Sequence, residues 1–221
     1  MEQALITLLA DETARIGVIL GPTELAQFAL FYDEFQIWND KMNLTAVDVG
    51  PPFIIRHFID SLLALPAIPP SATTLLDLGA GGGFPGIPVK IARANLKITL
   101  LDSSRKKTSF LRQVLIKLGQ GDSRVITGRA EDKLEVFPPE EKYDVVISRA
   151  TFKLPQFLTL GNAFVRKEGV IIAMKGREWR KESTEAESIA TTCHLRLIDV
   201  RETFLPHYGE IRALLIYNKD G

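Results

Sequence analysis

The chain has 221 residues, of which 46% are hydrophobic and 24% charged. This ordinary globular balance excludes a disordered chain, a collagen-like repeat and a bundle of membrane helices. Lysine plus arginine number 27, as do aspartate plus glutamate, so the whole molecule does not attract nucleic acid and any polyanion needs a local basic patch.

Three helical patterns are predicted before residue 67, over about residues 2–20, 23–40 and 51–65. Gly21-Pro22 separates the first two, and Pro51-Pro52 begins the third. Three- and four-residue spacing of apolar residues in the second indicates an amphipathic helix whose aromatic side chains pack in the core. We expect a helical extension, residues 1–66, and a main domain, residues 67–221, that together form one compact unit. The regularly spaced residues are Leu25, Phe28, Ala29, Tyr32, Phe35 and Trp38.

Short apolar runs follow, and helical stretches separate most of them. Such alternation, with strands apolar on both faces, predicts an α/β fold whose mostly parallel sheet has helices on both sides. Two longer runs at the end of the chain, separated by residues 206–209, suit an antiparallel hairpin at one sheet edge. The strand-like runs are 75–78, 98–101, 125–127, 145–147, 170–174, 195–204 and 211–218, which gives seven strands.

A glycine-rich turn follows the first predicted strand. Residues 75–86 read Leu-Leu-Asp-Leu-Gly-Ala-Gly-Gly-Gly-Phe-Pro-Gly, with Asp77 in the strand and Gly79 and Gly81 in the turn. Glycine permits positive φ and has no Cβ, so a ligand can approach the turn and the next helix N-terminus closely. Asp102 ends the second strand, where its carboxylate can accept hydrogen bonds from two ribose hydroxyls. These features predict a nucleoside cofactor, the simpler alternative being a tight turn with a capping aspartate.

Asp77 favours one nucleoside cofactor over another. Nicotinamide enzymes hold a pyrophosphate at this turn, which a carboxylate would repel, and they normally use a second domain for which no chain remains. S-adenosylmethionine offers a sulfonium and an α-amino group to the same carboxylate. We therefore predict S-adenosylmethionine as the cofactor.

The glycine segment and several further motifs resemble one known family. These motifs are Asn43-Leu44-Thr45, Arg56-His57 with Asp60-Ser61, Leu100-Leu101-Asp102-Ser103 with Lys106, Phe110-Leu111, Ile147-Ser148-Arg149-Ala150 and Lys175-Gly176. From residue 43 to 218 the chain resembles the bacterial glucose-inhibited division protein B family, the small-subunit ribosomal RNA guanine-N7 methyltransferases. The resemblance implies the Rossmann-like class I S-adenosylmethionine-dependent methyltransferase fold and methylation of a guanine N7 in 16S ribosomal RNA.

The resemblance also implies which residues line the cofactor pocket, and the glycine turn adds Asp77 and Gly81. Arg149 ends the fourth strand, where many class I enzymes place catalytic or substrate residues, so it is the catalytic candidate. The alternative role for Arg149 is a salt bridge at the sheet edge. The residues implied by the family are Gly79, Phe84, Asp102, Ser103, Ser104, Ala130, Glu131 and Arg149.

Basic residues follow three predicted strands at the edge that carries the cofactor motif. We expect a positive rim that positions RNA phosphates, although each residue alone could be a solvated charge at a helix start. Arg56 and His57 on the third helix are further candidates, and Asp60, four residues on, offers Arg56 an intrahelical ion pair. The candidate RNA-binding residues are Arg56, His57, Arg105, Lys106, Lys153, Lys175 and Arg177.

Metal and disulfide chemistry are not expected. His57, His194 and His207 lack metal-ligand spacing with Cys193, and a single cysteine excludes an internal disulfide. No apolar run approaches the roughly 18 residues of a membrane span, and the N-terminus lacks the basic stretch of a signal peptide. We expect a cytoplasmic monomer that acts on 16S ribosomal RNA or the small ribosomal subunit, without a membrane or a metal.

Guanine N7 carries a lone pair and no proton, so its methylation needs no general base. We expect the site to splay a guanine out of its stack and align N7 with the sulfonium methyl group. An arginine that reads guanine usually donates to both O6 and N7, but here N7 must stay free. Arg149 or Lys175 could therefore donate only to O6 or to a phosphate.

Three other interpretations remain open at the level of sequence. The chain could be a class I methyltransferase acting on another RNA position or on a small molecule. It could be a nicotinamide-dependent oxidoreductase, which titration with reduced nicotinamide would detect. It could also be a non-catalytic RNA-binding module in which the cofactor is only a structural ligand.

Overall fold

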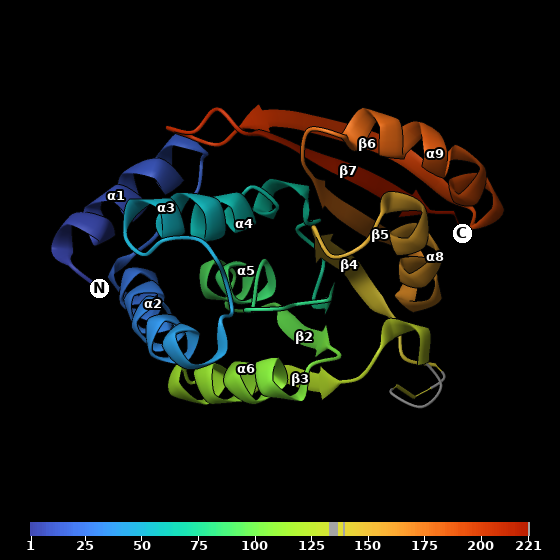
Figure 1. Cartoon of the computed structure of the whole chain (residues 1–221). Helices are drawn as coiled ribbons and strands as arrows, with labels where there is room; N and C mark the ends of the chain where they lie inside the picture. Colours follow the sequence, from blue (N-terminus) through green and yellow to red (C-terminus); the bar gives the residue numbers. More distant parts are fainter. Residues whose placement is uncertain (133–136, 139, 221) are drawn as a thin grey trace.

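The computed structural model describes residues 1–132, 137–138 and 140–220, and within them seven strands form one sheet (Figure 1). The strand order is β3-β2-β1-β4-β5-β7-β6; the first five are parallel, and β7 is antiparallel to both neighbours. The predicted α/β class and the antiparallel edge pair are confirmed. The strands are β1 Thr74–Leu78, β2 Lys97–Asp102, β3 Arg124–Thr127, β4 Tyr143–Arg149, β5 Val165–Lys175, β6 Leu195–Phe204 and β7 Ile211–Lys219.

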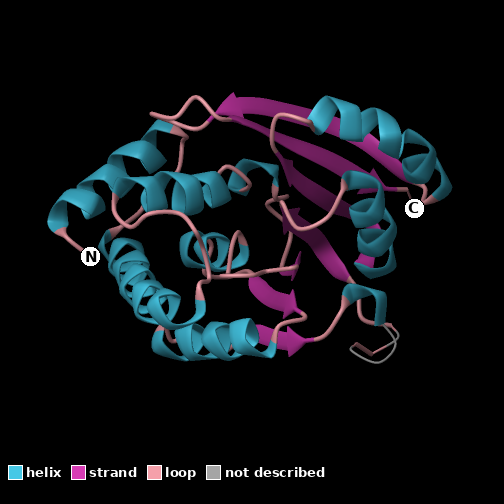
Figure 2. Cartoon of the chain, viewed as in Figure 1, coloured by secondary structure: helices cyan, strands magenta, loops and turns pink. Residues whose placement is uncertain are grey.

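Helices cover both faces of the sheet (Figure 2). The N-terminal helices, α5 and α6 lie on one face, and α8 and α9 lie on the other. Adjacent strand residues alternate between the two cores: Leu75 packs in the first and Leu76 in the second. The helices are α1 Gln3–Arg15, α2 Pro22–Met42, α3 Pro51–Phe53, α4 Asp60–Leu62, α5 Gly86–Ala92, α6 Arg105–Lys117, α8 Leu154–Phe164 and α9 Trp179–Thr192. A π-helical segment, Ile54–Ile59, joins α3 to α4, and Leu65–Ala67 and Ala130–Asp132 form single 3₁₀ turns.

The first helix is shorter than the predicted 2–20. It ends at Arg15 because Gly17 takes a positive φ of 78° and reverses the chain. The amide nitrogens of Gly17 and Val18 donate to the carbonyl oxygens of Ala14 and Thr13, which closes the last turn. Gly17 after the helical pattern could have predicted this helix end. The apolar residues 18–20 continue the helical spacing and led to the longer prediction.

The N-terminal helices and the sheet share one apolar core. Phe31 and Phe58 of the extension pack on Phe84, with ring centroids 5.3 and 6.2 Å apart, and Phe35 packs on Phe110 at 5.5 Å. The prediction that the aromatic residues of α2 are core residues is confirmed for Phe28, Tyr32 and Phe35, which are at most 5% exposed. The boundary at residue 66 stays a prediction from sequence, and the core runs across it.

The sheet order reverses between β1 and β4, which places a crevice at their carboxyl ends. The loops that follow β1, β2, β4 and β5 meet at this edge. No helix among the described residues is both long and apolar enough to span a lipid bilayer.

Candidate functional site

Two adjoining cavities open at the carboxyl edge of the sheet. The larger, of about 560 Å³, lies between the glycine loop after β1, the helix of residues 51–62 and the start of β7. The smaller, of about 230 Å³, lies at the ends of β2 and β3. Gly79 and Thr151 line both cavities, so the two spaces meet at the glycine loop.

The glycine loop folds as the sequence pattern requires. Gly79 and Gly81 have φ values of 76° and 58°, which favour glycine. A Cβ on Gly79 would lie 2.8 Å from the Oγ1 atom of Thr151, whereas a Cβ on Gly81 would meet nothing closer than 3.8 Å. Gly79 therefore permits a tight contact with the loop after β4, and Gly81 faces open space in the larger cavity.

Asp77 lies beneath this loop and is fully buried. Its Oδ2 atom accepts a hydrogen bond of 2.8 Å from the Gly86 amide, and its Oδ1 atom has no hydrogen-bond partner among the described residues. Burial raises the pKa of Asp77 to about 7. A buried carboxyl oxygen without a partner is costly, which fits an atom that receives a ligand group.

Asp102 lines the smaller cavity with Ser103, Ala130 and Glu131. Its Oδ2 atom accepts from the Gly81 amide at 2.9 Å, and its Oδ1 atom accepts from the Ser104 amide at 2.8 Å. Each carboxylate oxygen has a second lone pair, so Asp102 can still accept from a diol. The structure thus brings together the predicted acid and the Ala130-Glu131 pair, which are far apart in sequence.

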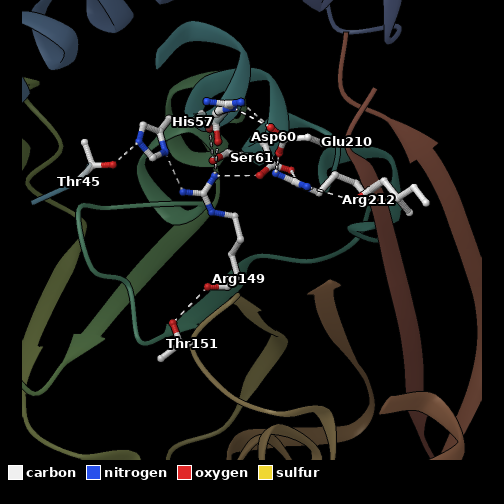
Figure 3. A network of polar contacts seen from close by, with 10 residues as sticks. Thr45, His57, Asp60, Ser61, Arg149, Thr151, Glu210 and Arg212 are labelled. Carbon is white, nitrogen blue, oxygen red and sulfur yellow. Dashed lines mark hydrogen bonds and ion pairs between the residues drawn. The ribbon is translucent and has the colours of Figure 1, made fainter. Parts of the chain in front are cut away.

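Arg149 enters the larger cavity from the end of β4 and is held by the helix of residues 51–62 (Figure 3). Its NH1 nitrogen donates to the carbonyl oxygen of Arg56 at 3.0 Å and to Oδ2 of Asp60 at 3.2 Å. Its NH2 nitrogen lies 3.2 Å from Nδ1 of His57. These contacts occupy three of the five N–H donors of the guanidinium.

The contact with Arg149 fixes the tautomer of His57. A guanidinium only donates, so Nδ1 accepts and the proton lies on Nε2, which donates to Oγ1 of Thr45 at 3.0 Å. Burial lowers the pKa of His57 to about 3, and the positive charges of Arg149 and Arg56 add to this effect. The neutral ring stacks on Phe84 with centroids 4.5 Å apart and planes 8° apart.

The alternative role for Arg56, an ion pair with Asp60 within one helix, is wrong. Asp60 is 3% exposed and turns inward, where its two oxygens meet Arg149 and Nε of Arg212, the latter at 3.0 Å. Arg56 instead donates to Oε1 of Glu210 at 2.8 Å, and its guanidinium lies 4.4 Å from the ring centroid of Tyr208. The two inward arginines need a counter-charge, and only the fold brings them to Asp60.

The candidate RNA-binding residues fall into different environments. Arg105, Lys106, Lys153 and Arg177 are exposed, whereas His57 is only 8% exposed. Lys175 is 7% exposed and donates to the carbonyl oxygen of Phe152 and to Glu182, both at 2.6 Å. Lys153, Lys175 and Arg177 line a third cavity of about 430 Å³ beside the larger one. The larger cavity itself is lined by Arg56, His57 and again Lys175.

Several cavity residues were absent from the sequence prediction. Thr151 donates to the carbonyl oxygens of Gly79 and Arg149, at 3.0 and 3.2 Å. Its position two residues after a strand end could have indicated it. Glu210 and Arg212 come from the C-terminal hairpin, and no local pattern connects them with β4. No group of three or more His, Cys, Asp or Glu side chains suited to a metal ion occurs in the described part of the chain.

Comparison with known proteins gives consistent sequence matches. Residues 24–207 match a family model described as rRNA small subunit methyltransferase G. The chain is 40% identical over 213 residues to ribosomal RNA small subunit methyltransferase G of Syntrophus aciditrophicus, covering 96% of this chain and 88% of the relative. It is 36% identical over 218 residues to the protein of that name from Acetivibrio thermocellus, covering 99% and 90%.

Solved structures show the fold independently. An O-methyltransferase from Bacillus cereus in complex with SAH matches with a TM-score of 0.64 and 17% identity, covering 96% of this chain and 97% of that one. A methyltransferase from Pyrococcus furiosus matches with a TM-score of 0.60 and 15% identity, covering 89% and 99%. These similarities and the strand order show the class I S-adenosylmethionine-dependent methyltransferase fold.

Proposed function

The chain belongs to the rRNA small subunit methyltransferase G family, and from this premise we propose that it methylates N7 of a guanine in 16S ribosomal RNA. S-adenosylmethionine is the methyl donor of this family. The observation that supports the proposal most directly is the larger cavity, where the glycine loop and Arg149 face the same space. The smaller cavity beside it supplies room for a nucleoside.

The residues present fit S-adenosylmethionine. Asp102, Ala130 and Glu131 would hold the adenosine half, because Asp102 retains lone pairs for a diol at the edge of a cavity. The glycine loop would hold the methionine half, because Gly81 leaves the backbone open and the unpartnered oxygen of Asp77 lies beneath the loop. The linings of the two cavities also support our proposed cofactor roles for Gly79, Phe84, Ser103 and Arg149. Ser104 lines neither cavity and would act through its amide, which donates to Asp102.

S-adenosylmethionine supplies an electrophilic methyl group on a sulfonium. The protein need not remove a proton, because the N7 lone pair of guanine attacks directly. This agrees with the state of His57, whose depressed pKa and tautomer make it an acceptor for Arg149 rather than a base for the substrate. The task of the cavity is therefore to align N7 with the methyl group, which is an effect of proximity and orientation.

Arg149 would act at the junction of cofactor and substrate. Three of its donors are used within the protein, and the remaining N–H groups can reach a ligand in the larger cavity. The arginine cannot donate to N7 during transfer, so its available partners are the cofactor carboxylate, O6 or a phosphate. Exposed Arg105, Lys106, Lys153 and Arg177 would position the RNA backbone around the opening. We further propose that the protein acts as a cytoplasmic monomer without a metal ion.

Transfer of a labelled methyl group tests the proposal. The acceptors are small-subunit RNA and particles from cells that lack the protein, and mass spectrometry identifies the modified nucleoside. We expect 7-methylguanosine at one position with the wild-type protein, and little product with Arg149→Ala despite a retained fold. No incorporation by a protein that binds S-adenosylmethionine would instead indicate another substrate or a non-catalytic module.

A further inference from the structure

Carboxylates are rare in the larger cavity. Among its described lining residues only Asp60 and Glu210 carry one. The Asp60 side chain is 4% exposed, and both its oxygens accept from arginines. The Glu210 side chain is 33% exposed, so a ligand in the cavity can reach it.

Glu210 is held in place and kept charged. Its Oε1 atom lies 2.8 Å from both Nε and NH2 of Arg56, and its Oε2 atom accepts from NH2 of Arg212 at 2.9 Å. Burial would raise the pKa of Glu210, but the hydrogen bonds from Arg212 and Arg56 outweigh it and hold the pKa below its ordinary value. Oε2, with a single arginine contact, retains a lone pair for a further donor.

We propose that Glu210 reads the acceptor base, with Oε2 accepting a hydrogen bond from the 2-amino group of guanine. This inference rests on the proposed function. Guanine is the only one of the four RNA bases with a 2-amino group, and that group lies on the ring away from N7. Recognition through Glu210 thus leaves N7 free for the methyl group. An arginine that donates to both O6 and N7 would instead occupy the N7 lone pair.

The charge of Glu210 also suits the reaction. As the N7–methyl bond forms and the sulfur–methyl bond breaks, the bonding pair returns to sulfur and the positive charge moves onto the guanine ring. No proton leaves the base in this step. A fixed carboxylate on the 2-amino group stabilises the cationic ring more than the neutral one, so it favours the transition state as well as binding.

Replacement of the acceptor guanosine by inosine, which lacks the 2-amino group, tests this proposal. The substrates are small subunits reconstituted with ligated 16S RNA that carries guanosine or inosine at the mapped position. For the wild-type enzyme we expect inosine to lower kcat/KM roughly 10- to 100-fold. For Glu210→Gln we expect a similar loss of kcat/KM on the guanosine substrate. Replacing guanosine by inosine should then lower the kcat/KM of this variant by only about threefold or less.

Glu202→Gln is the matched control, because the Glu202 side chain is 31% exposed, lies on neighbouring β6 and pairs with Arg180 outside the cavity. It should keep the wild-type guanosine-to-inosine ratio. If Glu210 served only to orient its two arginines, Glu210→Gln would lower kcat/KM on the guanosine and the inosine substrate by the same factor. The wild-type ratio between the two substrates would then remain, and this result would overturn the proposal. Equal wild-type rates on inosine and guanosine would overturn it even if the variant did not fold. Absence of wild-type transfer to guanosine would contradict the proposed function instead.

Discussion

His57 and Asp77 are buried titratable side chains whose pKa values move in opposite directions. The pKa of His57 falls from 6.5 to about 3, so between these values the unfolded chain binds more protons and the unfolding free energy rises with pH. The pKa of Asp77 rises from 3.8 to about 7, so in that window the folded chain binds more protons and the unfolding free energy falls with pH. The two contributions oppose each other over most of the same range.

Two substitutions should separate these contributions. His57→Phe keeps an aromatic ring against Phe84 and removes the rising contribution, so its unfolding free energy should fall with pH relative to wild type. Asp77→Asn removes the falling contribution and should give the opposite change. Each change in slope should reach at most about 1.4 kcal/mol per pH unit. Urea unfolding at several pH values between about 4.5 and 6 measures both slopes, and parallel curves for all three proteins would contradict the assignment.

Asp60 is the counter-charge for two arginines. Asp60→Asn should lower the unfolding free energy by about 3 kcal/mol, because it leaves the buried guanidinium of Arg149 without a charged partner and leaves Arg212 with Glu210 alone. It should also weaken S-adenosylmethionine binding, since Arg149 loses one of the contacts that orient it. Asp199→Asn is the control, because the Asp199 side chain is 43% exposed and pairs with exposed Arg201; its effect should stay within about 0.5 kcal/mol. Equal urea midpoints for the two variants would contradict this role.

At the scale of elements, the loop between β1 and α5 depends on the loop after β4. Gly79→Ala forces a Cβ into a residue with positive φ and against Thr151, so S-adenosylmethionine should bind at least about 10-fold more weakly. Adding Thr151→Ala should restore part of the affinity, because it opens the space but leaves the backbone strained. Isothermal titration calorimetry measures each step.

Gly121→Ala is the control for this loop, because its Cβ would meet nothing within 4 Å and its φ does not favour glycine. It should bind the cofactor like wild type. Equal losses with and without Thr151→Ala would show that the contact between the two loops does not limit binding.

At the scale of the whole molecule, one core connects the N-terminal helices with the sheet. The two tryptophans report on different parts: Trp38 lies in α2 against Phe110, and Trp179 lies in α9 on the other face of the sheet. Because residues 1–66 supply rings that cover Phe84 and Phe110, the chain should unfold as one unit. Trp38→Phe and Trp179→Phe each leave one tryptophan as a fluorescent reporter. In each variant, the unfolding midpoint measured by fluorescence should equal the midpoint measured by circular dichroism. If the fluorescence of Trp38 in Trp179→Phe changed at a lower denaturant concentration than the circular-dichroism signal, the N-terminal extension would unfold separately.

The sequence alone determined the type and order of the main elements and the cofactor motif, because these depend on local spacing. Short apolar runs, most of them separated by helical stretches, predicted all seven strands. A strand, a glycine turn, a helix and a second strand that ends in an acid predicted a nucleoside cofactor near Gly79 and Asp102. The family motifs indicated the function and a set of candidate pocket residues, of which Arg149 lines the larger cavity. The positive rim expected at the strand ends stays a prediction, and of its members Arg105, Lys106, Lys153 and Arg177 are exposed.

Only the tertiary structure decided the partners of those residues. Spacing of four residues suggested an Arg56–Asp60 pair, but β4 and β7 bring Arg149 and Arg212 to Asp60 across separations of 89 and 152 residues. The same packing brings Glu210 to Arg56 and takes Lys175 out of solvent. A charged side chain pairs with whichever opposite charge the fold brings within reach in a buried setting, and this choice depends on strand order rather than on neighbours in the sequence.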